Sequence, residues 1–147
     1  MQSIFNPETY QEILNRVENL NENAQPNWGK MTVGQMASHC QIPLNVILEK
    51  EDYGLKPNWL IILLFKKSMY NDKPWRKNMP TPKRFQVIET KDFNTEKQKL
   101  VTLLNELHEH KEKNNWQPHP AFGKLTKDQW GQMQYKHLNH HLTQFGV

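Results

Sequence analysis

Two histidines near the end of the chain have the spacing of a metal-ligand pair. His137 and His141 lie in TKDQWGQMQYKHLNHHLTQFGV, on an apolar stripe at helical spacing made of Trp130, Met133, His137, Leu138, His141 and Phe145. Residues four apart on a helix stack one turn above the other, so the two ring nitrogens can be directed at a common point. Two buried imidazoles are costly unless something binds both, and a metal ion does so. A third ligand from a facing helix would leave an open coordination position.

His39 is the candidate third ligand, because it lies in an apolar segment near the start of another predicted helix. His140 is displaced by about 60° from His137 around a helix of 3.6 residues per turn, which places it beside the pair as a candidate helper. Glu49 is the second candidate helper, since no carboxylate is an obvious general base. A buried histidine is more often a satisfied core residue than a ligand, so a purely structural role for these histidines stays open.

Capping residues mark the helices that must position these side chains. Asn6 before Pro7 predicts a helix over 7–22. Ser/Thr-x-x-Glu/Gln boxes begin at Thr32, Thr95 and Thr126, and they predict helices over 32–47, 95–112 and 126–145. Pro43 predicts a kink or an early end of the second of these helices. Helical apolar spacing supports all four helices, through Ile13, Val17 and Leu20; Val33, Met36, Ala37, Cys40, Leu44 and Ile47; Leu100, Leu103, Leu104 and Leu107; and the stripe containing His137.

The segment between the second and the 95–112 helix is apolar at first and then basic. Residues 58–70 are apolar enough to predict another helix, packed on several sides or covered by the basic stretch that follows. Residues 66–84 hold Lys66, Lys67, Lys73, Arg76, Lys77, Lys83 and Arg84 against Asp72 alone. No nucleic-acid motif accompanies these cations, so a solvated, proline-broken connection is favoured over a surface for nucleic acid or lipid headgroups. Residues 74–82 and 85–89 are predicted to be loop.

The length of the chain predicts one domain over residues 1–147, and the four amphipathic helices with little strand signal predict that it is all-α. The chain has 147 residues, of which 36% are hydrophobic and 23% charged, with a formal charge of +4. Cys40 is the only cysteine and the start lacks a secretory signal, so a cytoplasmic location is expected. The apolar run from Trp59 to Phe65 is far shorter than the roughly 20 residues of a membrane span. If the protein forms a homodimer, this apolar run is the expected interface.

Two segments resemble the DinB-like (YfiT-like) superfamily of metalloproteins: WGKMTVGQMASHC at 28–40 and KHLNHHLTQFGV at 136–147. Within it, residues 119–147 are similar to a bacterial branch known only as a domain of unknown function. The resemblance implies a DinB-like four-helix bundle whose middle helices are joined by the loop-rich, basic connection. It also implies metal ligands at His39, His137 and His141, for an ion of the Zn, Ni or Mn class.

The resemblance also implies an activity, since some superfamily members transfer a low-molecular-weight thiol, such as bacillithiol or mycothiol, to an electrophilic small molecule. An open metal position can hold such a thiol as the nucleophilic thiolate. Cys40 is a doubtful substitute for that thiol, and His119 and Phe122 either line the mouth of the site or serve as turn and packing residues. The alternatives are a small-ligand or protein-binding helical bundle with structural or vestigial histidines, and a binder of anionic surfaces through residues 66–84.

Overall fold

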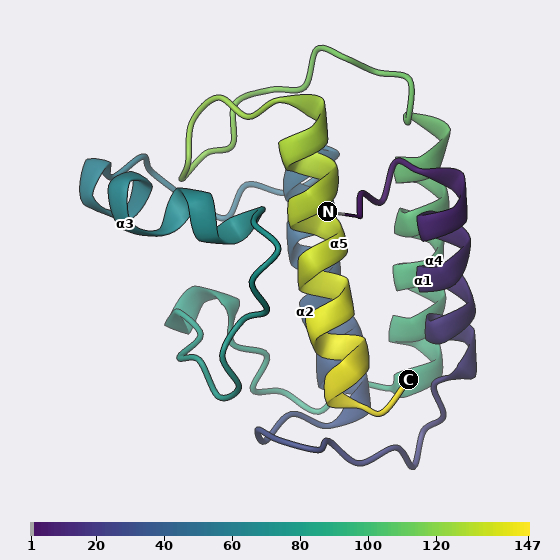
Figure 1. The fold of residues 1–147 in the computed structure, drawn as a ribbon. Coiled ribbons are helices and arrows are strands. Elements are labelled where there is room, and N and C mark those ends of the chain that lie inside the picture. The colour runs from purple at the N-terminus through teal and green to yellow at the C-terminus, as the bar shows by residue number, and fades with distance from the viewer. Residues whose placement is uncertain (1) are drawn as a thin grey trace.

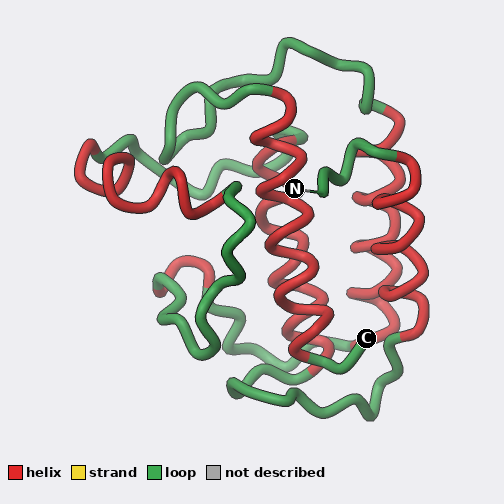
Figure 2. Tube along the Cα trace, in the orientation of Figure 1, coloured by secondary structure: helices red, strands yellow, loops and turns green. Residues whose placement is uncertain are grey.

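Residues 2–147, which the computed structural model describes, form five α-helices and one short 3-10 helix, and they contain no strand. The helices are α1 (Pro7–Asn19), α2 (Val33–Ile47), α3 (Trp59–Met69), η1 (Lys83–Phe85), α4 (Phe93–Glu109) and α5 (Lys127–Gln144), as Figures 1 and 2 show. The prediction of an all-α protein is therefore confirmed. Residues 85–89 contain no strand, and the segment between α2 and α4 is mostly loop, as expected.

The capping residues explain where the helices begin. Thr32 and Thr126 each form a complete capping box, in which the threonine side chain accepts from the backbone N–H of Gln35 or Gln129. The box predicted at Thr95 is wrong, because α4 begins earlier: Asp92 is its N-cap and accepts from the Thr95 N–H. This earlier start lets the helix bury Phe93, which a start at Thr95 would leave in the preceding loop.

Two further boundary predictions need correction. The first helix ends at Asn19 and not at residue 22, because Leu20 adopts an extended backbone and buries its side chain. The predicted early end at Pro43 is also wrong, since α2 continues through this proline to Ile47. Pro43 has no N–H to offer the His39 carbonyl one turn earlier. Its own carbonyl accepts from the Gln134 side chain of α5, at 3.2 Å.

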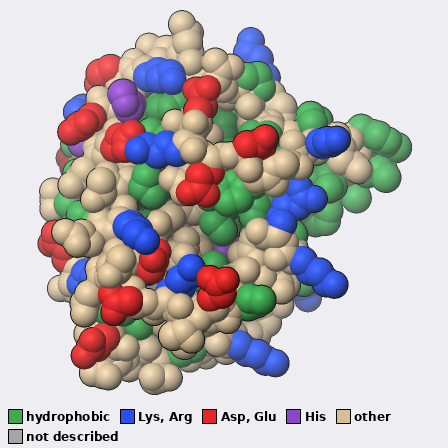
Figure 3. All heavy atoms as spheres, turned by 180° about the vertical axis from the view of Figure 1, so that it is seen from behind, with side chains coloured by type: hydrophobic (Ala, Val, Ile, Leu, Met, Phe, Trp, Pro, Cys, Tyr) green, Lys and Arg blue, Asp and Glu red, His purple; other side chains and the backbone are tan. Residues whose placement is uncertain are grey.

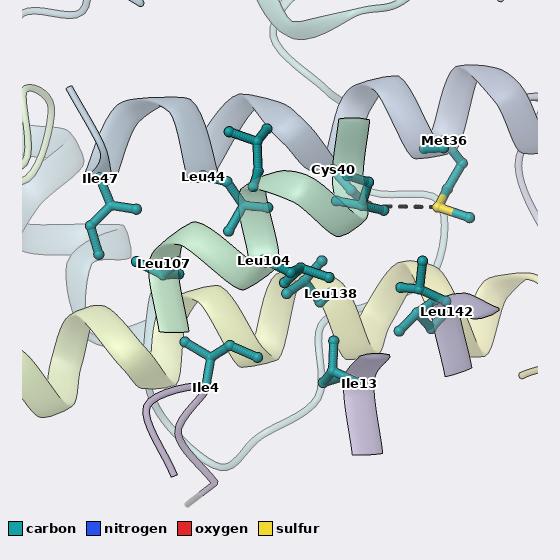
Figure 4. Close-up of a cluster of buried hydrophobic side chains, with 14 of the residues drawn as sticks. Ile4, Ile13, Met36, Cys40, Leu44, Ile47, Leu104, Leu107, Leu138 and Leu142 are labelled. Carbon is teal, nitrogen blue, oxygen red and sulfur yellow. Dashed lines mark hydrogen bonds between the residues drawn. The ribbon is translucent and has the colours of Figure 1, made fainter. Parts of the chain in front are cut away.

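The helices α1, α2, α4 and α5 surround the apolar core. Helix α2 packs against α4 and α5, and α1 packs against the same two helices. Figure 4 shows how side chains from all four helices and the N-terminal segment meet at the centre of this core. All apolar residues predicted to face inward from α1, α2 and α4 are buried. Helix α5 lies in front of α2 in Figure 1, and the contact between these two helices brings the three candidate ligands to one interface.

Helix α3 differs from the prediction made for it. It forms over Trp59–Met69, but none of its residues is buried, so the expectation that it is packed on several sides or covered is wrong. Asn58 caps it by accepting from the N–H groups of Leu60 and Ile61. Figures 1 and 3 show α3 projecting from the rest of the molecule. Among residues 2–147, no helix is both long and apolar enough to cross a lipid bilayer.

Candidate metal centre

The three candidate ligands meet between α2 and α5. His39 comes from α2, whereas His137 and His141 lie one turn apart on α5, and their exposed fractions are 7%, 9% and 8%. One ring nitrogen from each lies within 4.8 Å of the other two. The ring centroids are 4.7–5.0 Å apart in each of the three pairs. Three imidazoles of this spacing could hold one metal ion between them.

Hydrogen bonds orient two of the three rings. A backbone carbonyl can only accept, so the 3.0 Å contact between His39 Nδ1 and the Phe85 oxygen means that Nδ1 carries the proton. His141 Nδ1 lies 2.8 Å from Gln144 Oε1. The Gln144 amide nitrogen donates to the Trp28 carbonyl at 2.6 Å, which fixes the amide so that its oxygen faces His141. In both histidines Nε2 is therefore left with a free lone pair, the form in which imidazole binds a metal.

The protonation of His137 depends on whether an ion is bound. Its Nε2 lies 3.2 Å from His39 Nε2, and its Nδ1 is buried with no hydrogen-bond partner among residues 2–147. Without an ion, the lone pair of His39 Nε2 requires His137 to carry its proton on Nε2. The unprotonated Nδ1 of His137 is then left in an apolar environment with no donor. With a cation bound by the three Nε2 atoms, the proton of His137 lies on Nδ1 instead, so this buried atom has no partner among residues 2–147 in either case. The fit to a metal ion rests on the three ring nitrogens that lie within 4.8 Å of one another, the donor set of a transition-metal ion.

Burial keeps the three imidazoles neutral. It lowers the pKa of His39, although the hydrogen bond to Phe85 raises it. Burial, followed by the neighbouring His141, His39 and His140, places the pKa of His137 well below its usual value. For His141, burial and the nearby His39 lower the pKa to about 3, against the opposing effect of Gln144. Neutral imidazole is the metal-binding form, so these rings need not lose a proton at neutral pH.

A cleft of about 280 Å³ leads to the centre, and His39, His140 and His141 form part of its wall. The remaining lining comes from the loop before α2 and from the segment around η1: Trp28, Gly29, Lys30, Met31, Asn78, Met79, Thr81, Phe85, Gln86, Val87 and Gln144. None of these described residues is Asp or Glu. A ligand in this cleft would therefore meet histidines, apolar surface and uncharged polar side chains, with Lys30 as the one charged side chain among the lining residues.

The sequence profile of the family described as "Protein of unknown function (DUF1569)" matches residues 5–146. The chain belongs to the DUF1569 family. No curated protein and no solved structure matches it.

In this DUF1569 chain, the other residues singled out from the sequence have different surroundings. His140 is half-buried in the cleft wall, between the rings of Trp28 and Trp75 at centroid distances of 5.6 and 5.8 Å. Burial lowers its pKa, and the nearby His39 lowers it further. Glu49 lies beyond the far end of α2 and forms an ion pair with Lys113, so the structure does not bring it to the centre.

Three of the residues considered from the sequence serve the packing of the DUF1569 chain. His119 Nδ1 accepts from the backbone N–H groups of Ala121 and Phe122, and the His119 ring packs on Phe122 and Trp130. Neither His119 nor Phe122 lines the cleft. Cys40 is fully buried against Met36, and burial raises the pKa of its thiol, which makes Cys40 a core residue rather than a nucleophile.

Several residues of the centre could not be singled out from the sequence. Trp75 covers it from the connecting segment, 5.9 Å from the His137 ring, and Trp28 and Gln144 hold His140 and His141 from the other side. In the sequence, Trp75 is recognisable only as an aromatic residue among lysines. Phe85 gives no signal, because it contributes a backbone carbonyl that any residue would have. Gln144 had a usable signal, because it follows His141 by three residues, on the same face of the helix.

Proposed function

We propose that this chain is a DinB-like metalloprotein, in which His39, His137 and His141 bind one divalent ion of the Zn, Ni or Mn class. The observation that supports it most directly is the pair of hydrogen bonds, His39 to Phe85 and His141 to Gln144, that turn two Nε2 atoms toward the same point. In this proposal residues 1–147 form a single cytoplasmic domain, and α1, α2, α4 and α5 make its four-helix bundle.

The proposed activity is transfer of a low-molecular-weight thiol to an electrophilic small molecule. When bound, the metal supplies a Lewis-acidic position that lowers the pKa of a coordinated thiol or water. Three protein ligands leave room for such a group, and the 280 Å³ cleft gives it a path from solvent. The rings of Trp28 and Trp75 pack against His140, at centroid distances of 5.6 and 5.8 Å.

His140 is the residue proposed to hold or move a proton in this reaction. It is the one histidine of the cleft wall that is not assigned to the metal, and its lowered pKa keeps it neutral and able to accept a proton. The described lining contains no carboxylate that would compete for this role.

One observation favours a second candidate function, that of a non-catalytic small-ligand or protein-binding bundle. The three ligand candidates are buried, and no pair of acidic and basic groups of the kind used in hydrolysis lines the cleft. In this function the histidines and any metal would hold α2 and α5 together, and no substrate would be turned over.

Metal analysis tests the metal site that the proposed metalloprotein requires. The protein would be purified without a metal-affinity step, and bound metals would be quantified by mass spectrometry for wild type, His39→Ala and His141→Ala. His110→Ala, at the exposed end of α4, is the matched control. We expect about one equivalent of a transition metal in wild type and control, and little in the other two variants. Wild type without metal, even after incubation with Zn, Ni and Mn, would contradict the proposal.

A second experiment tests turnover. The loaded protein would be incubated with a panel of low-molecular-weight thiols and an electrophile, and thiol consumption would be followed with time. We expect a rate that is lost in His39→Ala and reduced at least tenfold in His140→Ala, which keeps its metal. A metal-loaded protein without activity toward any thiol would favour the binding function.

A further inference from the structure

Helix α3 exposes a large apolar surface. Trp59 and Leu63 are each 71% exposed and Leu64 is 65% exposed, and Leu60, Ile61 and Phe65 are also exposed. Only one side of the helix faces the protein: Ile62, Lys66 and Met69, which follow one another at helical spacing, are half-buried. Exposure of so many large apolar side chains in one helix marks an interaction site.

The width of this surface identifies the kind of partner. At 100° per residue, the exposed side chains from Trp59 to Phe65 spread over roughly 240° of the helix circumference. Packing against one other helix covers a stripe of about 100°, so a symmetric contact between two copies of α3 would leave much of this surface in water. Lipids adapt to the shape of a helix and can cover a wider part of its circumference than a single packed helix does. Helix α3 rises only about 16 Å over its length, about half of a bilayer core, so it would lie at the membrane surface.

The charge of the adjoining segment indicates which lipids would be bound. Lys66 and Lys67 lie in the last turn of α3, and residues 66–84 contain only one acidic residue, Asp72. Lys67, Lys73, Arg76 and Lys83 are exposed. Figure 3 shows Lys and Arg side chains beside the projecting apolar group. An apolar helix next to such a group of cations is the combination that binds anionic membrane surfaces.

We propose that α3 and the basic segment 66–84 bind the surface of bilayers that contain anionic phospholipids. The apolar side chains of α3 insert at the boundary between headgroups and acyl chains, and Lys67 and the neighbouring cations contact the phosphate and carboxylate groups of the lipids. This surface lies outside the metal centre, so the binding does not depend on the histidines.

Vesicle flotation tests the proposal. The full chain would be mixed with vesicles of phosphatidylcholine alone, or with vesicles containing 30% phosphatidylserine. Wild type, Leu63→Ser/Leu64→Ser and Lys67→Glu/Lys73→Glu would be compared. Ile88→Ser is the matched control, because Ile88 is 83% exposed but lies outside α3. His39→Ala is included to show that binding is independent of the metal centre.

We expect wild type, Ile88→Ser and His39→Ala to float with the anionic vesicles. Binding should be at least tenfold weaker with phosphatidylcholine alone, with Leu63→Ser/Leu64→Ser and with Lys67→Glu/Lys73→Glu. Absence of wild-type flotation, or equal flotation of all variants, would overturn the proposal. Sedimentation velocity without lipid tests the competing partner: a wild-type dimer that Leu63→Ser/Leu64→Ser dissociates, together with no vesicle binding, would assign α3 to a second copy of the chain.

Discussion

Gln144 sets the orientation of His141 by accepting from its Nδ1 while donating to the Trp28 carbonyl. We predict that Gln144→Met, which keeps the length of the side chain but removes both hydrogen bonds, weakens metal binding by about 10–100-fold, the usual effect of losing such a partner. The His141 ring would then be free to rotate or to change its tautomer. The apparent Kd for zinc, measured by competition with a chromophoric chelator, tests this.

Gln98→Met is the matched control for Gln144→Met, because Gln98 is exposed on α4. It should bind zinc as wild type does. Equal affinities of Gln144→Met and wild type would show that the orientation of His141 does not depend on this amide.

His119 makes a separate, pH-dependent contribution to stability. Burial, with a smaller effect of Lys66, lowers its folded-state pKa to about 4 from an ordinary value of 6.5. Above pH 6.5 the ring is neutral in both states. As the pH falls from about 6.5 to about 4, the unfolded chain takes up a proton that the folded chain does not. The free energy of unfolding therefore falls on acidification, by up to roughly 1.4 kcal/mol per pH unit.

We predict that His119→Asn flattens this dependence. The asparagine oxygen can accept from the N–H groups of Ala121 and Phe122 in place of Nδ1, but it does not titrate in this range. Urea unfolding at pH 7.5, 6, 5 and 4.5 would be compared between the two proteins, so that the effects of the other histidines cancel in the difference. If the free energies of unfolding of wild type and His119→Asn differ by the same amount at all four pH values, protonation of His119 does not cause the pH dependence.

Gly34 allows the first turn of α2 to approach the segment before α4. A Cβ at this position would overlap the Lys91 carbonyl, which belongs to the backbone and cannot rotate away. Alanine gains roughly 0.5–1 kcal/mol over glycine from helix propensity, whereas overpacking costs roughly 1–3 kcal/mol. We therefore predict that Gly34→Ala lowers the free energy of unfolding by about 1–2 kcal/mol, measured by urea denaturation. If Gly34→Ala has the same urea midpoint as wild type or a higher one, the segment around Lys91 moves away from the new methyl group without a cost in free energy.

Lys136 attaches the segment after α3 to α5. Its side chain is buried and donates to the Ser68 carbonyl and to both the carbonyl and side-chain oxygen of Asn71, at 2.7–3.0 Å. Trp75 donates to the same Ser68 carbonyl. Lys136 therefore helps to hold Trp75 over the histidines.

We predict that Lys136→Met loosens this segment while the rest of the fold persists. Unpaired carbonyls cost roughly 1–3 kcal/mol, which corresponds to about 5–150-fold faster amide exchange. Hydrogen exchange followed by mass spectrometry should show this acceleration in peptides covering 66–80 and not in α1 or α4. Lys124→Met, at an exposed lysine, is the control. Unchanged exchange in 66–80 would show that other contacts hold the segment.

The sequence predicted the parts of this fold in which each residue's role depends on its near neighbours. Thr32 and Thr126 cap helices because the partner glutamine lies three residues away, and His137 and His141 share a face because they are four apart. At Thr95 this reasoning failed, since Asp92 competes for the same cap. The placement of α3 and Trp75 could not be predicted, because it depends on contacts such as Lys136 with Asn71, which are distant in sequence. The same limit applies to Phe85, whose carbonyl orients His39.

The metal centre and the core connect α2 and α5 in different ways. The core contacts join them through apolar side chains such as Leu44 and Leu138, whereas the proposed ion would join them through His39 on one side and His137 and His141 on the other. Because an unfolded chain does not hold three histidines at this spacing, metal binding should favour the folded molecule as a whole.

We predict that zinc raises the thermal stability of the metal-free protein. At a free concentration 100 times the Kd, binding adds about 2.7 kcal/mol to the free energy of unfolding, which corresponds to roughly 5–10 °C in Tm for a chain of this size. Differential scanning calorimetry with and without zinc measures the shift, and a chelator should reverse it. His39→Ala should show no shift, because it leaves the pair on α5 without the ligand from α2. Equal shifts in both proteins would mean that zinc binds elsewhere, for example at the exposed His110, and that the centre does not join the two helices.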